Sequence, residues 1–480
     1  MKSFLLIIGI AIFSLSLSAQ NDVDVLRYSQ YQLGGTARSI GFGGAMGSLG
    51  ADFSALSINP AGIGLYKKSE VSITPTFYFS NINASMNASS SSGYKDNFNL
   101  NSYGIVLASD LGNDKGWKYI QFGIGVNRTN NFNYNYHITN ENTENSLLSD
   151  YQVQAFGKDP SQLDPFSTDL AWYNYLLEDT VRTGSGALAY TSPLAKGGAH
   201  QELKNTTWGS TNEMDISFGS SFSDIVYIGG TIGIPFVRYF EQYEYSESDL
   251  ADTIANFNKF ILDQSLETHG SGINFKFGII LRPTGFMRIG IAYHSPSYLY
   301  LDDKYSSRIV RLYDDGTTTN KESSIGRYNY QINTPMKIVG SATFTIARFF
   351  LISADVDYIN YSSGKLKADD YAFYDENAEI RDKYQPALNV RAGAELRLRP
   401  MSFRVGLGHY GSPYKDNINS GDSWVLSAGL GYRDRDFYMD LGVSNTTKAE
   451  DYYLYNPQII EKTELAYSNY RVAISVGYKF

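Results

Sequence analysis

The chain has 480 residues and a formal net charge of −9, with 39 Tyr, 27 Phe, 44 Gly and no Cys. The absence of cysteine excludes disulfides, iron–sulfur clusters and a cysteine nucleophile, and the five scattered histidines indicate no local metal site. The acidic balance, without a long run of Lys or Arg, argues against a nucleic-acid partner.

Residues 1–19 have the pattern of a secretory signal peptide. Lys2 supplies a positive start, residues 4–17 are mostly apolar, and Ala19 gives a small residue before Gln20. The apolar run falls short of the roughly 20 residues that a membrane anchor needs, so a retained signal anchor is the weaker alternative. We therefore expect the chain to be exported.

Residues 20–68 mix glycine-rich turns with apolar side chains. Small residues allow tight packing, and the Asn59-Pro60 step and the glycines favour turns over a strand or a long helix. A flexible linker is the alternative, but linkers lack this many apolar side chains that need burial. The segment is predicted to be a folded plug, or hatch.

From residue 69 onward, apolar side chains recur at every second position. Near the C-terminus Val472, Ile474 and Val476 alternate with smaller or polar residues, which is the period of a strand and not of a helix. The same count predicts fourteen strands, near residues 69–80, 98–109, 117–134, 212–222, 224–241, 271–282, 285–295, 331–345, 348–361, 386–399, 401–410, 422–433, 435–446 and 468–480.

The connections alternate between short turns and longer polar segments, the longest being 135–211, 242–270 and 296–330. Short turns at one rim and long loops at the other are typical of outer-membrane barrels. We thus predict an all-β fold, a 14-stranded antiparallel transmembrane β-barrel over residues 69–480 with long extracellular loops and an N-terminal hatch (plug) over residues 20–68.

A soluble β-sandwich or propeller is the alternative for so many alternating strands. Glycines recur on the polar face, as expected for a crowded lumen: Gly123, Gly125, Gly219, Gly278, Gly290, Gly393, Gly406, Gly408, Gly429 and Gly431. Aromatic residues gather at strand ends, where a membrane-interface girdle would lie: Tyr78, Phe79, Tyr239, Phe240, Tyr293, Tyr358, Tyr410, Tyr432 and Phe437. Both features favour the barrel.

Four arginines, Arg391, Arg397, Arg399 and Arg404, lie on or next to the predicted inward face. One interpretation is ion pairing that fixes the barrel and seats the plug, because unpaired charges in a narrow bore are costly. The other is contact with a carboxylate, belonging either to a ligand head group or to Asp52 of the plug.

The segment 135–211 contains an apolar cluster that includes Trp172, Tyr173, Tyr175 and Leu176. We hold two interpretations equal: a surface that captures hydrophobic molecules or a protein partner, or the loop's own small core. No H-E-x-x-H or G-x-S-x-G motif occurs, so we expect no enzyme activity, metal or cofactor.

Several stretches of the plug resemble the N-terminal hatch of the FadL/TodX outer-membrane transporters: residues 35–39, residues 50–52 and Asn59-Pro60-Ala61-Gly62-Ile63. The resemblance implies a barrel that moves long-chain fatty acids or other hydrophobic compounds when the hatch rearranges. Only Asn59, Pro60 and Ala61 match the family motif closely enough to carry a role over. The loop composition and the signal sequence are similar to those of Bacteroidetes proteins.

We therefore expect an uptake channel for hydrophobic small molecules in the outer membrane of a Gram-negative bacterium, surrounded by outer-membrane lipid. The alternative is a non-transporting barrel that binds a protein partner at its extracellular loops, resembling the carrier subunit of type IX secretion. A general porin is a third, weaker interpretation, since a plug suits polar solutes poorly.

Overall fold

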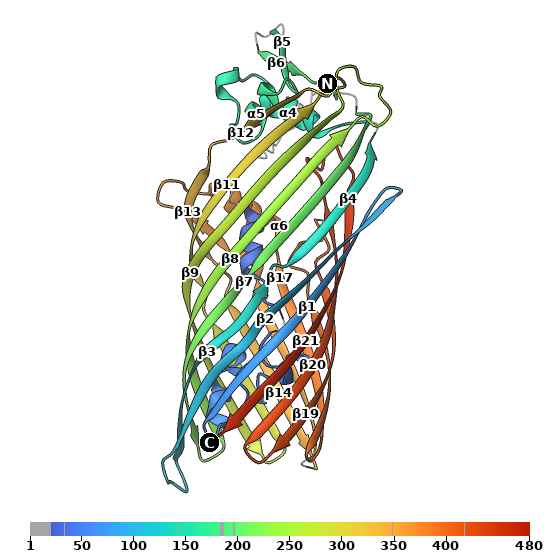
Figure 1. Cartoon of the computed structure of the whole chain (residues 1–480). Coiled ribbons are helices and arrows are strands. Elements are labelled where there is room, and N and C mark those ends of the chain that lie inside the picture. Colours follow the sequence, from blue (N-terminus) through green and yellow to red (C-terminus); the bar gives the residue numbers. More distant parts are fainter. Residues whose placement is uncertain are drawn as a thin grey trace, which may run out of the picture.

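The computed structural model of the chain describes residues 21–480, except residues 33, 143, 183–186, 195–196, 348 and 417. Its strands form a closed, tilted cylinder that holds short helices of the N-terminal segment inside and carries a cap at one end (Figure 1). The predicted signal peptide, residues 1–19, lies outside the described residues. In the described part of the chain, no helix is long and apolar enough to cross a membrane.

Nineteen strands belong to one sheet, and β1 pairs antiparallel with both β2 and β21, so the sheet closes on itself. Five of the nineteen extend or flank others, which leaves fourteen barrel strands. These are β1 (Glu70–Met86), β2 (Ser89–Asp110), β3 (Trp117–Asn131), β7 (Ala199–Phe222), β8 (Val226–Ser248), β9 (Lys259–Thr284), β10 (Met287–His294), β14 (Lys337–Ile346), β15 (Phe350–Asn360), β17 (Pro386–Leu398), β18 (Met401–Tyr410), β19 (Ser423–Asp434), β20 (Phe437–Tyr452) and β21 (Thr463–Lys479).

The five additional strands lie toward the capped end. They are β4 (Tyr134–Asn142), β11 (Tyr298–Leu312), β12 (Thr318–Glu322), β13 (Gly326–Asn333) and β16 (Lys365–Lys367). β4 and β3 pair with the same strand, β7, and β11 and β10 likewise share β9. They therefore continue the barrel wall above the main strands.

Each of the fourteen predicted strands coincides with a barrel strand, which confirms the closed antiparallel barrel. The predicted long loops at 242–270 and 296–330 are wrong: β8 and β9 leave only residues 249–258 between them, and β11, β12 and β13 occupy most of 298–333. β7 likewise begins at Ala199, inside the predicted loop 135–211. In these projecting parts the inward face mixes apolar side chains such as Phe260 and Leu262 with polar ones, and the outward face is mostly polar, so the period of two is weaker in the sequence.

Strand lengths differ strongly around the barrel. β7, β8 and β9 have 24, 23 and 26 residues, whereas β18 has 10. A tilted strand crosses a bilayer with about 9–11 residues, so the long strands project well beyond it and carry the cap (Figure 1). The other end, called the turn end here, has short connections such as 399–400 and 435–436 and holds the C-terminus.

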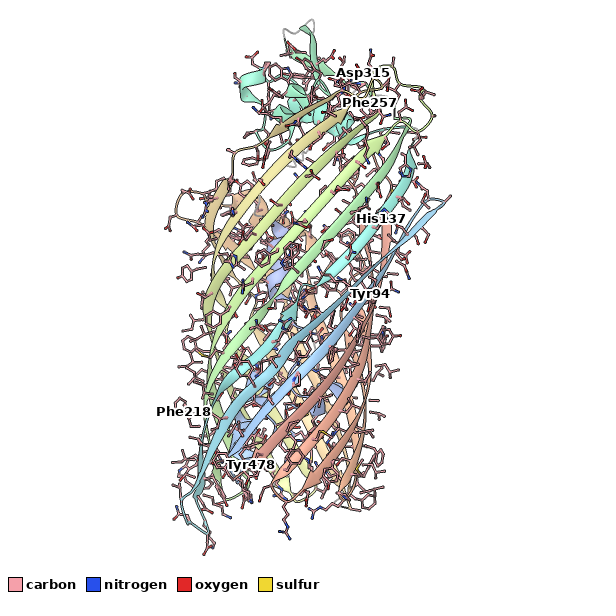
Figure 2. All side chains as sticks on the ribbon, viewed as in Figure 1. Tyr94, His137, Phe218, Phe257, Asp315 and Tyr478 are labelled. Carbon is pink, nitrogen blue, oxygen red and sulfur yellow. The ribbon has the colours of Figure 1, made fainter. Side chains whose placement is uncertain are left out.

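Side chains alternate across the wall. In β17 and β18, Leu388, Val390 and Val405 are exposed on the outside, whereas Arg391 and Arg404 are buried inside. Figure 2 shows Phe218 projecting from the outer wall near the turn end. An apolar exterior with a polar interior is the arrangement that lipid on the outside selects.

The N-terminal segment forms short helices inside the cylinder: α1 (Asp22–Ser29), α2 (Ala37–Gly41), α3 (Ala55–Ile58) and η1 (Pro60–Leu65). Side-chain caps start three of them: Asn21 for α1, Thr36 for α2 and Asn59 for η1. α2, α3 and η1 pack against the wall toward the turn end, and α1 lies nearer the cap (Figure 1).

The cap has its own hydrophobic core. The cap consists of α4 (Leu147–Ala155), η2 (Pro160–Gln162), α5 (Thr168–Tyr173), β5 (Glu178–Arg182) and β6 (Leu188–Thr191). Leu148, Leu170 and Leu176 pack with Tyr245 and Phe260 from the projecting strands. A second, smaller excursion, η3 (Tyr361–Ser363) and α6 (Tyr374–Lys383), stands between β15 and β17 and packs on α1.

Candidate functional site

The N-terminal segment is seated on a lumenal wall of glycines. Eight of the ten glycines expected in the lumen would place an added Cβ within 3.1 Å of an atom of residues 41–63: Gly123, Gly125, Gly219, Gly278, Gly290, Gly393, Gly406 and Gly429. A side chain at these positions would collide with the segment. The glycines therefore provide the space that the segment occupies.

Asn59, Pro60 and Ala61 form the turn at the centre of this contact. The fully buried Asn59 amide donates to the Gly47 carbonyl at 2.7 Å, and its Oδ1 accepts the Ala61 N–H at 3.1 Å. Asn59 caps η1 and Pro60 takes its first position, where a missing N–H costs nothing. An added Cβ at Gly278 would lie 1.8 Å from Asn59 Oδ1.

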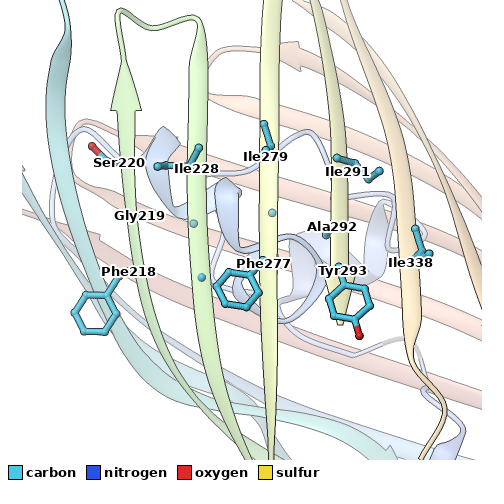
Figure 3. Close-up of a pocket in the computed structure, with 13 residues that line it drawn as sticks. Phe218, Gly219, Ser220, Ile228, Phe277, Ile279, Ile291, Ala292, Tyr293 and Ile338 are labelled. Atoms are coloured by element: carbon cyan, nitrogen blue, oxygen red, sulfur yellow. The ribbon is translucent and has the colours of Figure 1, made fainter. Parts of the chain in front are cut away.

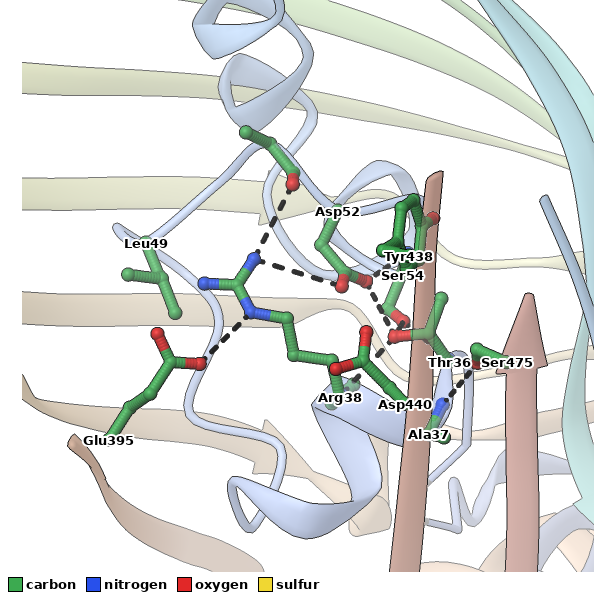
Figure 4. A network of polar contacts seen from close by, with 12 residues as sticks. Thr36, Ala37, Arg38, Leu49, Asp52, Ser54, Glu395, Tyr438, Asp440 and Ser475 are labelled. Atoms are coloured by element: carbon green, nitrogen blue, oxygen red, sulfur yellow. Dashed lines mark hydrogen bonds and ion pairs between the residues drawn. The ribbon is translucent and has the colours of Figure 1, made fainter. Parts of the chain in front are cut away.

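Toward the turn end, polar contacts link α2 to the barrel (Figure 4). The Arg38 guanidinium lies 3.3 Å from Glu395 of β17 and 3.9 Å from Asp52 of its own segment. Thr36 Oγ1 donates to Asp52 at 2.8 Å, and the Ala37 N–H donates to Ser475 Oγ of β21 at 2.7 Å. The segment is thus tied to strands on different sides of the barrel.

The four predicted arginines do not form a single group: Arg397, Arg399 and Arg404 lie toward the turn end, and Arg391 lies apart from them. Arg391 forms a bidentate pair with Asp357 at 2.7 and 2.8 Å. Arg397 and Arg404 each contact Glu395 at 2.5 Å, and Arg404 also contacts Asp440 at 2.7 Å. Arg399 is exposed in the turn after β17. Within the described residues the ion pair of Asp52 is with Arg38, so three of the four follow the ion-pairing interpretation.

Above the glycine-seated part lies a cavity of about 790 Å³ whose walls are rich in tyrosine. Edge-on ring pairs join its walls, such as Tyr134 with Tyr467 at 5.9 Å and Tyr136 with Tyr452 at 5.6 Å between ring centroids. Its tyrosines are Tyr31, Tyr78, Tyr134, Tyr136, Tyr239, Tyr361, Tyr410, Tyr414, Tyr452, Tyr453, Tyr455 and Tyr467. Such walls offer apolar ring faces with polar rims.

Three residues predicted for the membrane-interface girdle lie inside the barrel instead, so that part of the prediction is wrong. Tyr78, Tyr239 and Tyr410 face the lumen, whereas Tyr293, Tyr358, Tyr432 and Phe437 are exposed on the outside. The alternation along each strand indicates which face a tyrosine occupies: Tyr78 follows the exposed Phe77 and therefore points inward.

Arg128 and Arg471 are functional candidates that the sequence-based selection missed. Both border a small recess beside the cavity, and Arg471 also lines the cavity itself. Neither forms an ion pair with any described residue. Arg128 donates to Asn131 Oδ1 at 3.0 Å, and the Arg471 guanidinium lies over the Tyr78 ring at 5.6 Å. Arg471 lines the main cavity and Arg128 lines the recess, and the carboxylates of the main cavity, Glu241, Glu450 and Asp451, form no ion pair with either arginine.

The cavity narrows downward at residues that it shares with a lower cavity of about 80 Å³: Tyr31, Gln32, Asn389 and Tyr410. Gln32 bridges the neck by donating to Tyr134 Oη at 2.7 Å and to the Asn131 carbonyl at 3.2 Å. Behind the lower cavity, the buried Lys276 pairs with Glu213 and, at 3.1 Å, with Asp215, which accepts the Ser57 hydroxyl at 2.6 Å. The N-terminal segment lines this lower cavity through Ser54, Ser57 and Ile58.

α1 lies beside the cavity and is held by α6. The Asp22 carboxylate accepts from Lys383 Nζ at 3.1 Å and from Tyr384 Oη at 2.9 Å. Burial, and next the Asp22 carboxylate, raises the pKa of Tyr384. On its other side α1 buries Val25 and Leu26 in a cluster with wall residues such as Tyr239.

On the outer surface of the barrel, an apolar groove of about 710 Å³ crosses β7, β8, β9 and β10 (Figure 3). Phe218, Phe277, Ile291 and Tyr293 project around it into the lipid-facing zone. Its floor includes Gly219, Gly229 and Gly278, which touch the N-terminal segment from inside. At this place only backbone separates the exterior from the Asn59 turn.

The four residues of the predicted apolar cluster in the outer loop lie in two different environments, buried and exposed. Leu176 is fully buried in the cap core, which agrees with the interpretation of the loop's own small core and not with surface capture, and Trp172 packs partly buried against the same core. Tyr173 and Tyr175 are exposed, and Lys321 Nζ lies 4.7 Å from the Tyr173 ring centroid. Of the four residues, Tyr173 and Tyr175 are the ones exposed enough for the predicted surface capture.

Comparison with known proteins agrees with this architecture. Residues 205–476, more than half of the chain, match the sequence profile of the outer membrane protein transport protein family (OMPP1/FadL/TodX). No curated protein sequence matches the chain.

Solved structures share the fold at low sequence identity. A Pseudomonas aeruginosa FadL homologue is 13% identical, with a TM-score of 0.56 over 94% of this chain and 99% of that one. The Pseudomonas putida toluene transporter TodX is 12% identical, with a TM-score of 0.54 over 94% and 99%. The Ralstonia pickettii toluene transporter TbuX is 13% identical, with a TM-score of 0.51 over 93% and 99%. The chain belongs to the OMPP1/FadL/TodX family of channels for hydrophobic compounds, and it is an outer-membrane β-barrel of a Gram-negative bacterium.

Proposed function

We propose that this barrel takes up hydrophobic small molecules and that residues 20–68 are the hatch that gates it. The observation that carries the proposal is the tyrosine-walled cavity directly above a segment that fills the lower lumen. A ligand enters from the cap side, rests among the rings, and passes when the Asn59-Pro60-Ala61 turn leaves its glycine seat. Outer-membrane lipid surrounds the apolar exterior.

Long-chain fatty acids are the substrate class that we favour within this function. The buried Arg471 and the nearby Arg128 have no carboxylate partner among the described residues, so an acid head group would complete them. The tyrosine ring faces would then hold the acyl chain. The solved relatives TodX and TbuX are toluene transporters, so small aromatic hydrocarbons are the competing substrate class.

A reversible tether tests the gating. Ser48 of the hatch and Thr343 of β14 place their hydroxyl oxygens 2.8 Å apart, so Ser48→Cys with Thr343→Cys brings two sulfurs within reach of a disulfide in a chain without other cysteines. Uptake of radiolabelled palmitate and toluene is measured in an uptake-deficient Gram-negative host. We expect oxidation to stop uptake and reduction to restore it.

The matched control keeps Thr343→Cys and pairs it with Ser353→Cys of β15, whose hydroxyls also lie 2.8 Å apart. This tether joins two barrel strands and leaves the hatch free, so uptake should persist in both redox states. Undiminished uptake through the oxidised hatch tether would show that the hatch does not need to move.

The protein-binding carrier is the second candidate, and the cap supports it. Val153, Phe156, Tyr173 and Tyr175 leave apolar surface exposed on an element with its own core. A carrier of this kind would give no hydrophobe uptake even with the hatch reduced and free, and this outcome of the tether experiment would favour it.

A further inference from the structure

A third cavity, of about 540 Å³, opens at the turn end, on the far side of the hatch from the tyrosine-walled cavity. Short turns and the C-terminus mark this end of an outer-membrane barrel as periplasmic. Asp436 is the lining carboxylate. The lining cations, called the basic vestibule below, are Arg38, Arg288, Arg397, Arg399, Arg433, Arg435 and Lys479.

The carboxylates behind the vestibule wall already contact cations, and two of them serve more than one; Asp52 lies 3.9 Å from Arg38. Glu395 contacts Arg38, Arg397 and also Arg404, which stands behind the wall. Asp440 contacts Arg404 at 2.7 Å and lies 3.9 Å from Arg433. The Lys479 ammonium pairs with Glu70 at 2.9 Å. A carboxylate that contacts two or three arginines carries one negative charge, so it cannot fully neutralise each of them.

Three vestibule arginines form no ion pair with any described residue. Arg288 donates to the Leu49 carbonyl of the hatch at 2.9 Å. Arg399 and Arg435 lie in the neighbouring turns after β17 and β19. Positive charges gathered in one cavity repel one another. The chain as a whole has a net charge of −9, so the excess of positive charge is restricted to this cavity and not a property of the whole surface.

We propose that the basic vestibule is an oxyanion-binding site that takes a carboxylate or phosphate group from the periplasmic side. Planar guanidinium forks match the paired oxygens of these groups. The group belongs either to a soluble molecule or to the head of an amphiphile. The site goes beyond the proposed uptake, since it lies below the closed hatch, and its ligand touches the hatch through Arg38 and the residues around Leu49.

The test uses a reporter inside the vestibule. Met401 lines it, and because the chain has no cysteine, Met401→Cys carries a single environment-sensitive fluorophore. The folded barrel in a neutral detergent is titrated with inorganic phosphate, with dodecyl phosphate and with uncharged dodecanol. We expect a saturable response to phosphate, to dodecyl phosphate or to both, and none to dodecanol. A response to inorganic phosphate assigns a soluble ligand, and a response to dodecyl phosphate alone assigns an amphiphile.

The variant Arg399→Gln/Arg435→Gln alters exposed turn residues and should keep the fold, which the heat-dependent gel shift of the barrel verifies. Its affinity should fall by about tenfold or more, since each lost charged hydrogen bond is worth about 1.5–3 kcal/mol. Arg282→Gln, at the same end but outside the vestibule, should stay within about twofold of the parent. No saturable response to either phosphate probe, or an equal affinity in the two variants, would overturn the proposal, whatever the outcome of the uptake experiment.

Discussion

At the residue scale, the fit between hatch and barrel depends on the missing side chain of Gly278. The Asn59 amide occupies the space that a Cβ would need, and its hydrogen bonds to Gly47 and Ala61 fix the turn in that position. A methyl group there must push the turn away from the wall, because the backbone of β9 is held by both of its neighbours.

Gly278→Ala should therefore loosen the hatch. Overpacking of this kind costs about 1–3 kcal/mol, so amide hydrogen exchange over residues 55–65 should accelerate by about 5- to 150-fold. Gly340→Ala on β14 is the control, since its Cβ would meet only the Val356 carbonyl, at 4.0 Å. Equal exchange rates in the two variants would show that the Gly278 contact does not hold the hatch.

Two other residues bear on substrate choice. If Arg128 and Arg471 receive an acid head group, Arg128→Gln/Arg471→Gln should lower palmitate uptake by about tenfold or more while toluene uptake stays unchanged. Arg238→Gln, exposed on the outer face of β8, is the matched control. A parallel loss of both substrates would indicate a structural role for the two arginines.

At the scale of elements, one buried carboxylate joins the cap to the barrel beside the apolar core that they share. Glu247, at the end of β8, accepts hydrogen bonds from the Leu147 N–H at 2.8 Å, from Gln201 at 3.1 Å and from Tyr245 at 2.6 Å, and also from the Ser146 hydroxyl. These donors come from α4, β7 and β8, so one side chain connects the helix to two strands.

Removing that carboxylate should release the cap without unfolding the barrel. Glu247→Ala leaves several buried donors unpaired, at about 1–3 kcal/mol each, so we expect the cap to be cleaved about tenfold faster by added chymotrypsin. Glu244→Ala, three residues earlier, removes only an exposed pair with Lys204 at 3.4 Å and should change little. Cleavage at the parent rate in Glu247→Ala would place the cap's anchor elsewhere.

At the scale of the whole molecule, the barrel is inverted relative to a soluble protein. Its exterior carries exposed Leu, Ile, Val and Phe side chains, and charged residues such as Glu395, Arg404 and Asp440 are buried in the lumen around the N-terminal segment. Lipid outside and a packed, ion-paired lumen inside both require this distribution.

A charge in the apolar band should therefore impair insertion. Val405 is exposed at the middle of β18, and Val405→Arg should cost about 2–4 kcal/mol. Val153→Arg in the cap, also on an exposed valine, should cost almost nothing. The fraction folded into lipid vesicles in a urea titration measures both, and equal midpoints would contradict the position of the band.

The sequence alone determined the barrel strands, because alternation is a local property: each residue's neighbours two positions away reveal its face. It likewise placed the Asn59-Pro60 turn, since capping and the fixed proline geometry act within a few residues. The tertiary structure decided which charges meet. Arg404 reaches Glu395 and Asp440 only through the register of four neighbouring strands, β17 to β20. The lumenal side chains of Tyr78, Tyr239 and Tyr410 converge on one cavity only when the sheet closes. Register is set between separate strands, and closure pairs β1 with β21 about four hundred positions away, so no local pattern encodes either.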